Sequence, residues 1–278
     1  MTHKCIQFLI LSTLFLIPFG LFSQYQVDFK VIYKPDLIYD LLSESTMSMK
    51  INEKSAEDLK KELDEEQIAS FNKNAIRKST AKIITGHQDQ DGKFPMTVME
   101  INEMEGLYEM LSDSMTYTGW MNTYGIESID SISSENGYTQ SVQNINKESL
   151  KQFSLEEFPE RIMAVGDSFE IKPSINLPGF SNFREMNARS VFILERIDQN
   201  KAYFKSIETY QMSFFQDENN KINYSGQGTG LYVYDIDQNH FIDSSANQNF
   251  IGNITFQAKS IMMEIIINHK SNIEIHPN

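Results

Sequence analysis

A Gly-Asp-Ser segment in mid-chain and an Asp-x-x-His segment further on contain the residue types of a serine hydrolase. The first is Gly166-Asp167-Ser168, which follows an apolar run, and the second begins with Asp237 and ends with His240. In a serine hydrolase the serine attacks the substrate, a histidine takes its proton and an aspartate orients the histidine. Ser168, His240 and Asp237 are therefore the candidate catalytic residues.

The two segments resemble the blocks of GDSL-type serine esterases, but their context differs. In that family the Gly-Asp-Ser block opens an α/β fold near the mature N-terminus, whereas here it lies in mid-chain. The chain between the segments has hairpin-like alternation and no Gly or Asn block for an oxyanion hole. Residues 232–241 are better explained as a strand, a turn with residues 237–239 at its tip, and a second strand. We expect a non-catalytic protein and keep the esterase as the alternative.

Metal-binding patterns are incomplete. Residues 89–92 read Asp-x-Asp-Gly and residues 235–239 read Asp-x-Asp-x-Asn, but neither segment has the bidentate Glu of a calcium loop. The histidines lack a ligand spacing such as His-x-x-x-His, so we expect them in turns or at the surface. They are His87, His240, His269 and His276. The sequence predicts no metal site and no cofactor.

Three alternating glycines have the composition of a nucleotide-binding loop. Gly226, Gly228 and Gly230 lead into a strand at residues 231–236, whereas a phosphate cradle requires a helix N-terminus at that point. We therefore interpret these glycines as a bend or bulge in a strand.

Methionine and aromatic residues gather between residues 104 and 120. Flexible methionines beside aromatic rings suit an adaptable apolar cavity or a surface for a partner, although an ordinary core uses the same side chains. The candidate ligand-cavity residues are Met104, Leu107, Tyr108, Met110, Met115, Tyr117 and Trp120.

Alternation of apolar and polar residues is the dominant pattern, and it predicts strands. The predicted strands cover residues 27–33, 46–51, 78–85, 95–101, 190–197, 202–214, 228–236 and 261–267. Asp91-Gly92, residues 136–137 (Asn-Gly) and residues 198–200 supply tight turns between them. We expect a mainly β protein, α+β at the margin, built as a curved antiparallel sheet, a sandwich or an open barrel.

Two segments interrupt this alternation and predict helices packed on the sheet. Residues 55–73 combine a capping pair, Ser55 and Asp58, with one apolar stripe. Residues 147–158 form a shorter stretch that Pro159 ends. A single domain over residues 24–278 is the simplest organisation, with two lobes that could meet near residues 146–160.

The first 23 residues have the layout of a secretory signal peptide. Lys4 precedes an apolar run that is too short to span a bilayer, and Pro18 and Gly20 follow it. We predict cleavage near Ser23-Gln24 and no transmembrane segment after it. The only cysteine, Cys5, leaves with the signal, so the exported chain is expected to lack disulfides.

The charge balance restricts the partners. Lys and Arg number 24 against 38 Asp and Glu, a net charge of −14. Nucleic acids and anionic lipid surfaces would be repelled by such a chain. An apolar small molecule or an envelope protein is the partner that we expect.

Four short motifs are similar to those of a family of exported, β-rich proteins of Bacteroidota-type bacteria. They are residues 165–169, 192–197, 201–204 and 230–235, and the likeness spans about residues 95 to 257. Phe169 stands where Trp is usual in that family, and Asn239-His240 stands where Gly is expected. The resemblance implies export and a β fold, and it implies no activity.

These observations predict a non-catalytic protein of the periplasm or cell surface that holds an apolar ligand or a partner segment. The alternatives are the esterase and a structural or assembly role in the cell envelope.

Overall fold

The structure, a computed structural model, describes residues 26–52, 55, 57, 72–106, 111–134, 153–172, 183–215, 221–256 and 259–278. The strands are β1 (Gln26–Phe29), β2 (Leu37–Ile51), β3 (Lys73–Thr85), β4 (Phe94–Glu105), β5 (Leu111–Asn122), β6 (Gly125–Ser134), β7 (Arg161–Ala164), β8 (Ser168–Ile171), β9 (Phe183–Asp198), β10 (Lys201–Phe215), β11 (Lys221–Asp235), β12 (His240–Phe256) and β13 (Lys259–Pro277).

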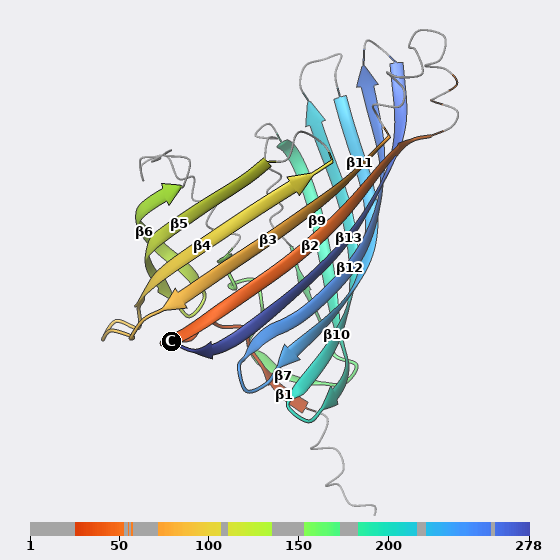
Figure 1. The fold of residues 1–278 in the computed structure, drawn as a ribbon. Helices are drawn as coiled ribbons and strands as arrows, with labels where there is room; N and C mark the ends of the chain where they lie inside the picture. Colours follow the sequence, from red (N-terminus) through yellow and green to blue (C-terminus); the bar gives the residue numbers. More distant parts are fainter. Residues whose placement is uncertain are drawn as a thin grey trace, which may run out of the picture.

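Eleven of these strands form one antiparallel sheet in the order β6-β5-β4-β3-β2-β13-β12-β11-β10-β9-β8. Neighbouring strands in this sheet are also consecutive in the chain, with one exception, the pair β2 and β13. This pair joins one half of the sheet, β2 to β6, to the other half, β8 to β13. The sheet is strongly bent, and the small β1–β7 sheet lies at its lower end (Figure 1). The predicted mainly β class with a curved antiparallel sheet is confirmed.

The predicted hairpin turns follow from residue type. Gly92 lies between β3 and β4 with φ of 81°, a backbone angle that costs glycine little. Gln199 and Asn239 take similar left-handed angles, 54° and 56°, in the β9–β10 and β11–β12 turns. In the latter turn Asp235 Oδ1 accepts hydrogen bonds from the N–H groups of Asp237 and Gln238, at 3.0 and 2.9 Å. Local turn chemistry therefore sets the register of these hairpins.

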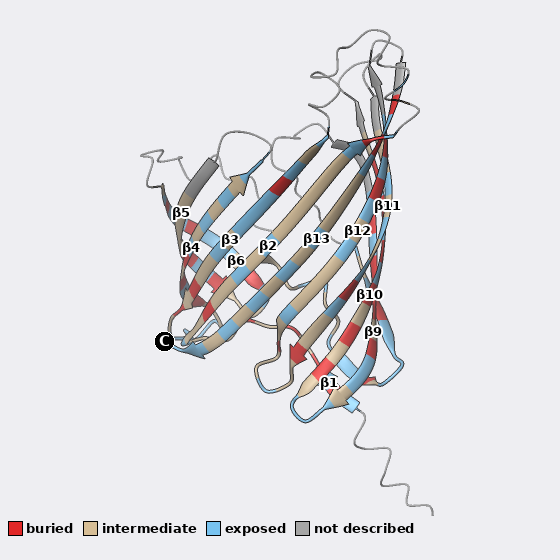
Figure 2. Ribbon diagram, turned by 45° about the vertical axis from the view of Figure 1, so that its right-hand side comes forward, coloured by how far each residue is buried: buried red, intermediate tan, exposed pale blue. Residues whose placement is uncertain are grey.

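Burial alternates along the strands and gives the large sheet two faces (Figure 2). In β10 the side chains of Phe204, Glu208 and Met212 are buried, whereas Ile207 and Gln211 are exposed. The buried set lies on the side that packs against β1 and β7, which we call the inner face; the opposite side is the outer face. Because side chains alternate along a strand, every second residue of each regular strand belongs to the inner face.

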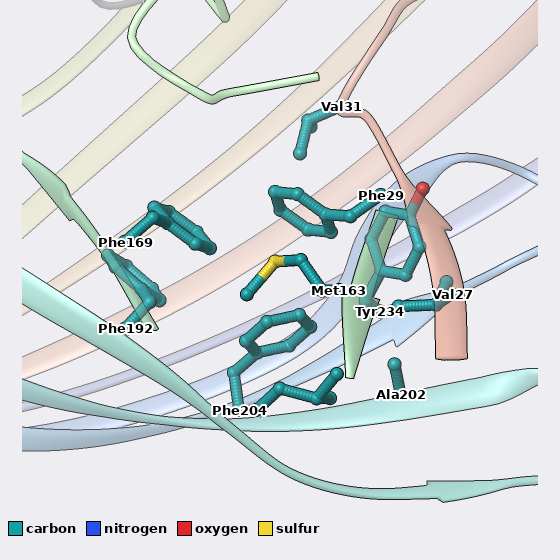
Figure 3. Close-up of a cluster of buried hydrophobic side chains, with 10 residues drawn as sticks. Val27, Phe29, Val31, Met163, Phe169, Phe192, Ala202, Phe204 and Tyr234 are labelled. Carbon is teal, nitrogen blue, oxygen red and sulfur yellow. The ribbon is translucent and has the colours of Figure 1, made fainter. Parts of the chain in front are cut away.

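Phe29 of β1 is the centre of the first core cluster (Figure 3). Its side chain is completely buried, and its ring centroid lies 5.0 Å from those of Phe169 and Tyr234 and 5.1 Å from that of Phe204. Aromatic rings at such separations attract one another beyond the effect of burial alone. The ring of Phe29 therefore fastens β1 to β8, β10 and β11 at once.

A second core cluster lies under the other half of the sheet. Its most buried side chains are Tyr39, Ile83, Phe94, Val98 and Met121, from β2 to β5. Both clusters include residues close to the hairpin turns, so the core occupies the end of the sheet where those hairpins turn.

Residues 30–34, which we call the strap, connect the two halves across the bend. The N–H of Ile32 donates to the carbonyl of Asn239 in the β11–β12 turn at 3.0 Å, and the N–H of Tyr33 donates to the carbonyl of Thr123 in the β5–β6 turn at 2.8 Å. Four strands, β4, β3, β2 and β13, lie between these two hairpins in the sheet. The strap therefore crosses the concave side of the bend and forms hydrogen bonds with one hairpin from each half of the sheet.

One helix prediction is wrong in its described part. Residues 147–152 lie outside the described residues, and residues 153–158 form a short turn with a hydrogen bond from Phe158 N–H to the Leu155 carbonyl, at 3.1 Å. Phe158 packs against the first core cluster, Phe153 against the second and Leu155 against both. The open turn lets these side chains reach both clusters.

The other helix prediction and the signal peptide fall mainly outside the described residues. Of residues 55–73 the structure describes Ser55 and Glu57, which are helical, Asn72, and Lys73, which begins β3. Residues 1–25 and the turn at residues 136–137 are outside the described ranges as well. Within those ranges no helix is long and apolar enough to cross a membrane.

Substitution of Phe29 tests the first core cluster. Phe29→Ala should lower the free energy of unfolding by roughly 3 to 5 kcal/mol, because it leaves a cavity among three aromatic rings. Urea denaturation followed by circular dichroism measures the loss. Ile162→Ala is the matched control, since Ile162 is 67% exposed on β7, the strand that pairs with β1. An equal loss in both variants would contradict this account of the core.

Candidate functional site

The kind of side chain on the inner face changes with distance along the strands from the core clusters. Above the core clusters lies a band of polar residues, which we call the polar belt, and beyond it an apolar zone. The belt comprises Ser43, Ser45, Arg77, Ser79, Asn102, Ser206, Glu208, Ser244, Gln248, His269 and Ser271, all at inward positions in the strand registers. One of its rows across β12, β13, β2, β3 and β4 reads Ser244, Ser271, Ser43, Ser79, Asn102.

The apolar zone is half-buried rather than sealed. Its side chains include Met47, Met49, Ile265, Ile267 and Tyr224, which are only partly covered. Ile265, Ile267 and Tyr224 pack against a small buried cluster of Ala188, Tyr210, Met212 and Phe250. The inner face therefore continues as apolar surface beyond the polar belt.

Glu208 is the buried acid of the belt, with 3% of its surface exposed. Its Oε1 accepts hydrogen bonds from Ser206 Oγ at 2.9 Å and Tyr232 OH at 3.3 Å. Its Oε2 accepts from Tyr210 OH at 2.6 Å and Gln248 Nε2 at 2.8 Å. Four donors fill the acceptor positions of one carboxyl group, so Glu208 is satisfied within the protein.

The phenol groups of this network stay protonated. Burial, with Glu208 as a neighbour, raises the pKa of both Tyr210 and Tyr232 well above the ordinary value. Both hydroxyls therefore remain donors to Glu208 at any physiological pH. The network orders the side chains that separate the core from the apolar zone.

Glycines on β11 make room for this network, and they do not form the bulge that was one of the two expectations for them. Gly226, Gly228 and Gly230 pair in regular register with β10 and β12, and the register shift of β11 lies at Val233/Tyr234. A Cβ at Gly226 would lie 2.4 Å from the ring of Phe250, and one at Gly228 would lie 3.1 Å from Glu208 Oε2. Large side chains from the neighbouring strands therefore lie across the glycines.

Arg77 and His269 lie in one row of the belt, on either side of Ser45. Ser45 Oγ and His269 Nδ1 are 2.8 Å apart, and burial lowers the pKa of His269. Arg77 Nη2 donates to Asn102 Oδ1 at 2.9 Å, and Asn102 Nδ2 donates to Glu100 Oε1 at 2.8 Å. The row thus combines hydrogen-bond donors with one cationic side chain, that of Arg77.

The burial of Glu208 could have been predicted from its position in the alternating pattern of β10. Glu208 is in phase with Phe204, Tyr210 and Met212, so strand alternation alone places a carboxyl group on the apolar side of β10. A charged residue at an inward position predicts a buried polar network, because a buried acid without partners would be strongly unfavourable.

The predicted ligand-cavity residues divide between the two faces. Met104, Met115 and Tyr117 lie on the inner face, where Tyr117 OH donates to Met115 Sδ at 2.9 Å. Trp120 lies on the outer face, 37% exposed, because it is an odd number of residues from Tyr117 along β5. Leu107, Tyr108 and Met110 are outside the described residues. Trp120 therefore cannot line the same cavity as Met104, Met115 and Tyr117.

Two surface depressions lie elsewhere. One, of about 670 Å³, is lined mainly by outer-face residues of β9 to β12 with Glu170 and Lys172, and the other, of about 390 Å³, lies at the β5–β6 turn. Neither contains a predicted cavity residue, and the larger is bordered by the ion pair of Arg189 Nε with Glu170 Oε2 at 2.8 Å.

The candidate catalytic residues occupy separate places. Ser168 begins β8 and pairs with Ile193, whereas His240 begins β12, and β9, β10 and β11 lie between those strands in the sheet. Asp237 Oδ2 accepts from Asn200 Nδ2 at 3.3 Å. None of the hydrogen bonds among described residues joins two members of the triad. The esterase therefore stays a prediction without support from side-chain contacts.

His240 is a core residue, which corrects its expected place at the surface or in a turn. It is 6% exposed, and its ring centroid lies 5.6 Å from that of Tyr33 and 5.5 Å from that of Tyr39. Nδ1 lies 2.9 Å from the Phe241 carbonyl, and the buried Nε2 has no hydrogen-bond partner among described residues. Burial lowers the pKa of His240, so the neutral imidazole packs against the strap.

The aspartates of the incomplete calcium patterns serve as turn acceptors. Asp89 Oδ1 accepts from the N–H groups of Asp91 and Lys93, both at 2.9 Å. Asp235 does the same in the β11–β12 turn. Across the described ranges no group of three His, Cys, Asp or Glu side chains is placed to hold a metal ion.

Comparison with known proteins identifies no family. No family model matches the chain, and no curated protein matches it, so the likeness to an exported β-rich family stays a prediction. Among solved structures, a mutant porin of Rh. blastica aligns with 84% of this chain and 99% of its own, at 7% identity and a TM-score of 0.25. An outer membrane channel from Pseudomonas putida F1 aligns with 89% of this chain and 98% of its own, at 6% identity and a TM-score of 0.24. Such scores lie below those of a shared fold.

Substitution of Glu208 tests the buried network. Glu208→Gln should lower the free energy of unfolding by about 1 to 3 kcal/mol, because the new amide nitrogen is a donor that faces other donors. Glu195→Gln on the same sheet is the control, since Glu195 is exposed. Urea denaturation compares the two, and unchanged stability of Glu208→Gln would rule out the network as a structural unit.

Acidification tests the burial of His240. The folded state holds this imidazole neutral, so its contribution to stability is complete above the ordinary pKa of 6.5 and is lost as the pH falls towards the lowered folded value. His240→Phe should therefore lose less stability than the unaltered protein between about pH 7.5 and 5, where few carboxyl groups titrate. Urea midpoints across this range give the slope, and equal slopes would refute the assignment.

Proposed function

We propose that this protein is an exported, non-catalytic binding protein of the cell envelope whose inner face holds an apolar ligand. The supporting observation is the half-buried apolar zone of Met47, Met49, Ile265 and Ile267, which continues the inner face beyond the two larger core clusters. Binding of a ligand that covers apolar surface of this kind is favourable by about 25 cal/mol for each Å² covered.

The charged residues of the outer face are consistent with exposure of that face to water. Lys270, Glu44, Lys78 and Glu103 form one row across β13, β2, β3 and β4, all exposed and alternating in sign. Opposite charges on adjacent strands stabilise a sheet, whereas each Lys or Arg at the middle of a bilayer would cost about 2 to 4 kcal/mol. We infer that this face meets the aqueous phase, and that the apolar ligand binds on the inner side.

Export is supported by the first 23 residues, whose apolar run behind Lys4 has the composition of a signal peptide. An exported protein without cysteines depends on its core alone, and the two larger core clusters supply most of it. Ile265 and Ile267 also pack against the small third cluster, but their side chains are only partly covered. The zone is therefore available for binding.

Substitution within the apolar zone tests the proposal. Ile267→Gln should weaken binding of a long-chain apolar probe such as hexadecanol about tenfold, because it places an amide in the path of the chain. Asn268→Gln is the matched control, since Asn268 is the next residue of β13, exposed on the outer face. Titration calorimetry measures both affinities.

The unaltered protein decides the proposal directly. Native mass spectrometry of protein purified from the envelope of its own host should show an apolar adduct that is released on denaturation. If that protein carries no adduct and also fails to bind hexadecanol, the proposed function is wrong.

A further inference from the structure

Arg77 differs from three other basic residues, which pair with carboxylates. Lys82, Lys93 and Arg189 each form an ion pair with a carboxylate: Asp40 at 3.6 Å, Glu127 at 2.5 Å and Glu170 at 2.8 Å. The described hydrogen bond of the Arg77 guanidinium goes instead to a neutral amide, Asn102 Oδ1, and no ion pair joins Arg77 to a described carboxylate.

Arg77 lies at a border between two kinds of side chain on the inner face. It is an inner-face residue of β3, between Ser45 on β2 and Met104 on β4, one row from Ala75 and Met47 of the apolar zone. A guanidinium at the border between hydroxyl groups and apolar side chains is where the charged end of an amphiphile would lie.

Two described carboxyl groups of the inner face already have hydrogen-bond partners. Glu208 accepts four hydrogen bonds from its own network. Glu100 accepts from Asn102 Nδ2 at 2.8 Å, so the amide of Asn102 stands between Glu100 and Arg77. Arg77 therefore keeps donors for a ligand, and Ser45, hydrogen-bonded to His269, lies about 5 Å away on the adjacent strand.

We propose that the ligand of the inner face carries an anionic head group, a carboxylate or a phosphate, which binds Arg77 in the polar belt while the apolar chain lies along the zone of Met47 and Ile267. This inference rests on the proposed function. Guanidinium matches both head groups because its parallel N–H donors can bind two oxygens at once. On a chain of net charge −14 an anionic ligand needs such a local cation.

Titration calorimetry with three probes of equal chain length tests the inference: hexadecanoic acid, hexadecyl phosphate and hexadecanol. At least one anion should bind about tenfold more tightly than the alcohol, and its advantage should shrink as salt is added, because exposed charges are screened. The preferred anion distinguishes a carboxylate from a phosphate head group.

Arg77→Gln should remove the advantage of the anion while hexadecanol still binds, which also shows that the variant is folded. Lys78→Gln is the matched control, because it removes the same charge from the adjacent, exposed outer-face position. It should leave the preference unchanged.

The other possible results contradict either the head-group inference or the proposed function. Equal affinity for acid, phosphate and alcohol, or an anion preference that survives in Arg77→Gln, overturns the head-group inference and leaves the proposed function standing. Failure of all three probes to bind overturns the proposed function together with this inference.

Discussion

The bend of the large sheet depends on the strap at residues 30–34. A sheet with two unjoined edges has no closed ring of hydrogen bonds to hold its curvature, so another element must do so. The strap bonds to Thr123 in one half and to Asn239 in the other, while Phe29, just before it, is held by aromatic rings of β8, β10 and β11. The hydroxyl of Tyr234 donates to the Lys30 carbonyl at 2.6 Å and secures the start of the strap. Without these contacts the two halves would share only the β2–β13 ladder, and the inner face would lose its shape.

The layers of the inner face follow from where side chains can be enclosed. Beside the strap, β1 and β7 cover the inner face, so large apolar residues fill it. Further along the strands no described element covers the face, and small hydroxyl residues replace the large ones. Glu208 is accommodated at this border because Tyr210, Tyr232, Ser206 and Gln248 surround it with donors. A partly satisfied network would be less favourable than an apolar core, so the complete set of partners makes the polar belt a stable boundary.

The two faces of the sheet therefore have separate roles. Alternating charges on the outer face suit water and stabilise adjacent strands, whereas the inner face presents apolar side chains beside a belt that includes Arg77. An amphiphilic ligand matches this arrangement because its chain and its head group find their counterparts in neighbouring rows. The hydrogen bonds of the described residues do not join Ser168, Asp237 and His240 to one another, and His240 is part of the packing between the strap and β2.

The sequence by itself determined the β class, parts of eight strands and the turns at residues 91–92, 198–200 and 237–239, because alternation and turn preference are local properties. It did not predict β5, β7 or β8, and it extended the first strand to residue 33, whereas β1 ends at Phe29. Alternation along β5 also sets Trp120 and Tyr117 on opposite faces. Only the tertiary structure decided the burial of His240, which depends on rings more than two hundred residues away in Tyr33 and Tyr39. It likewise decided that residues 153–158 form a turn and that glycines on β11 lie under neighbouring side chains. These features arise from contacts between distant strands, and a local pattern contains no information about which strands will meet.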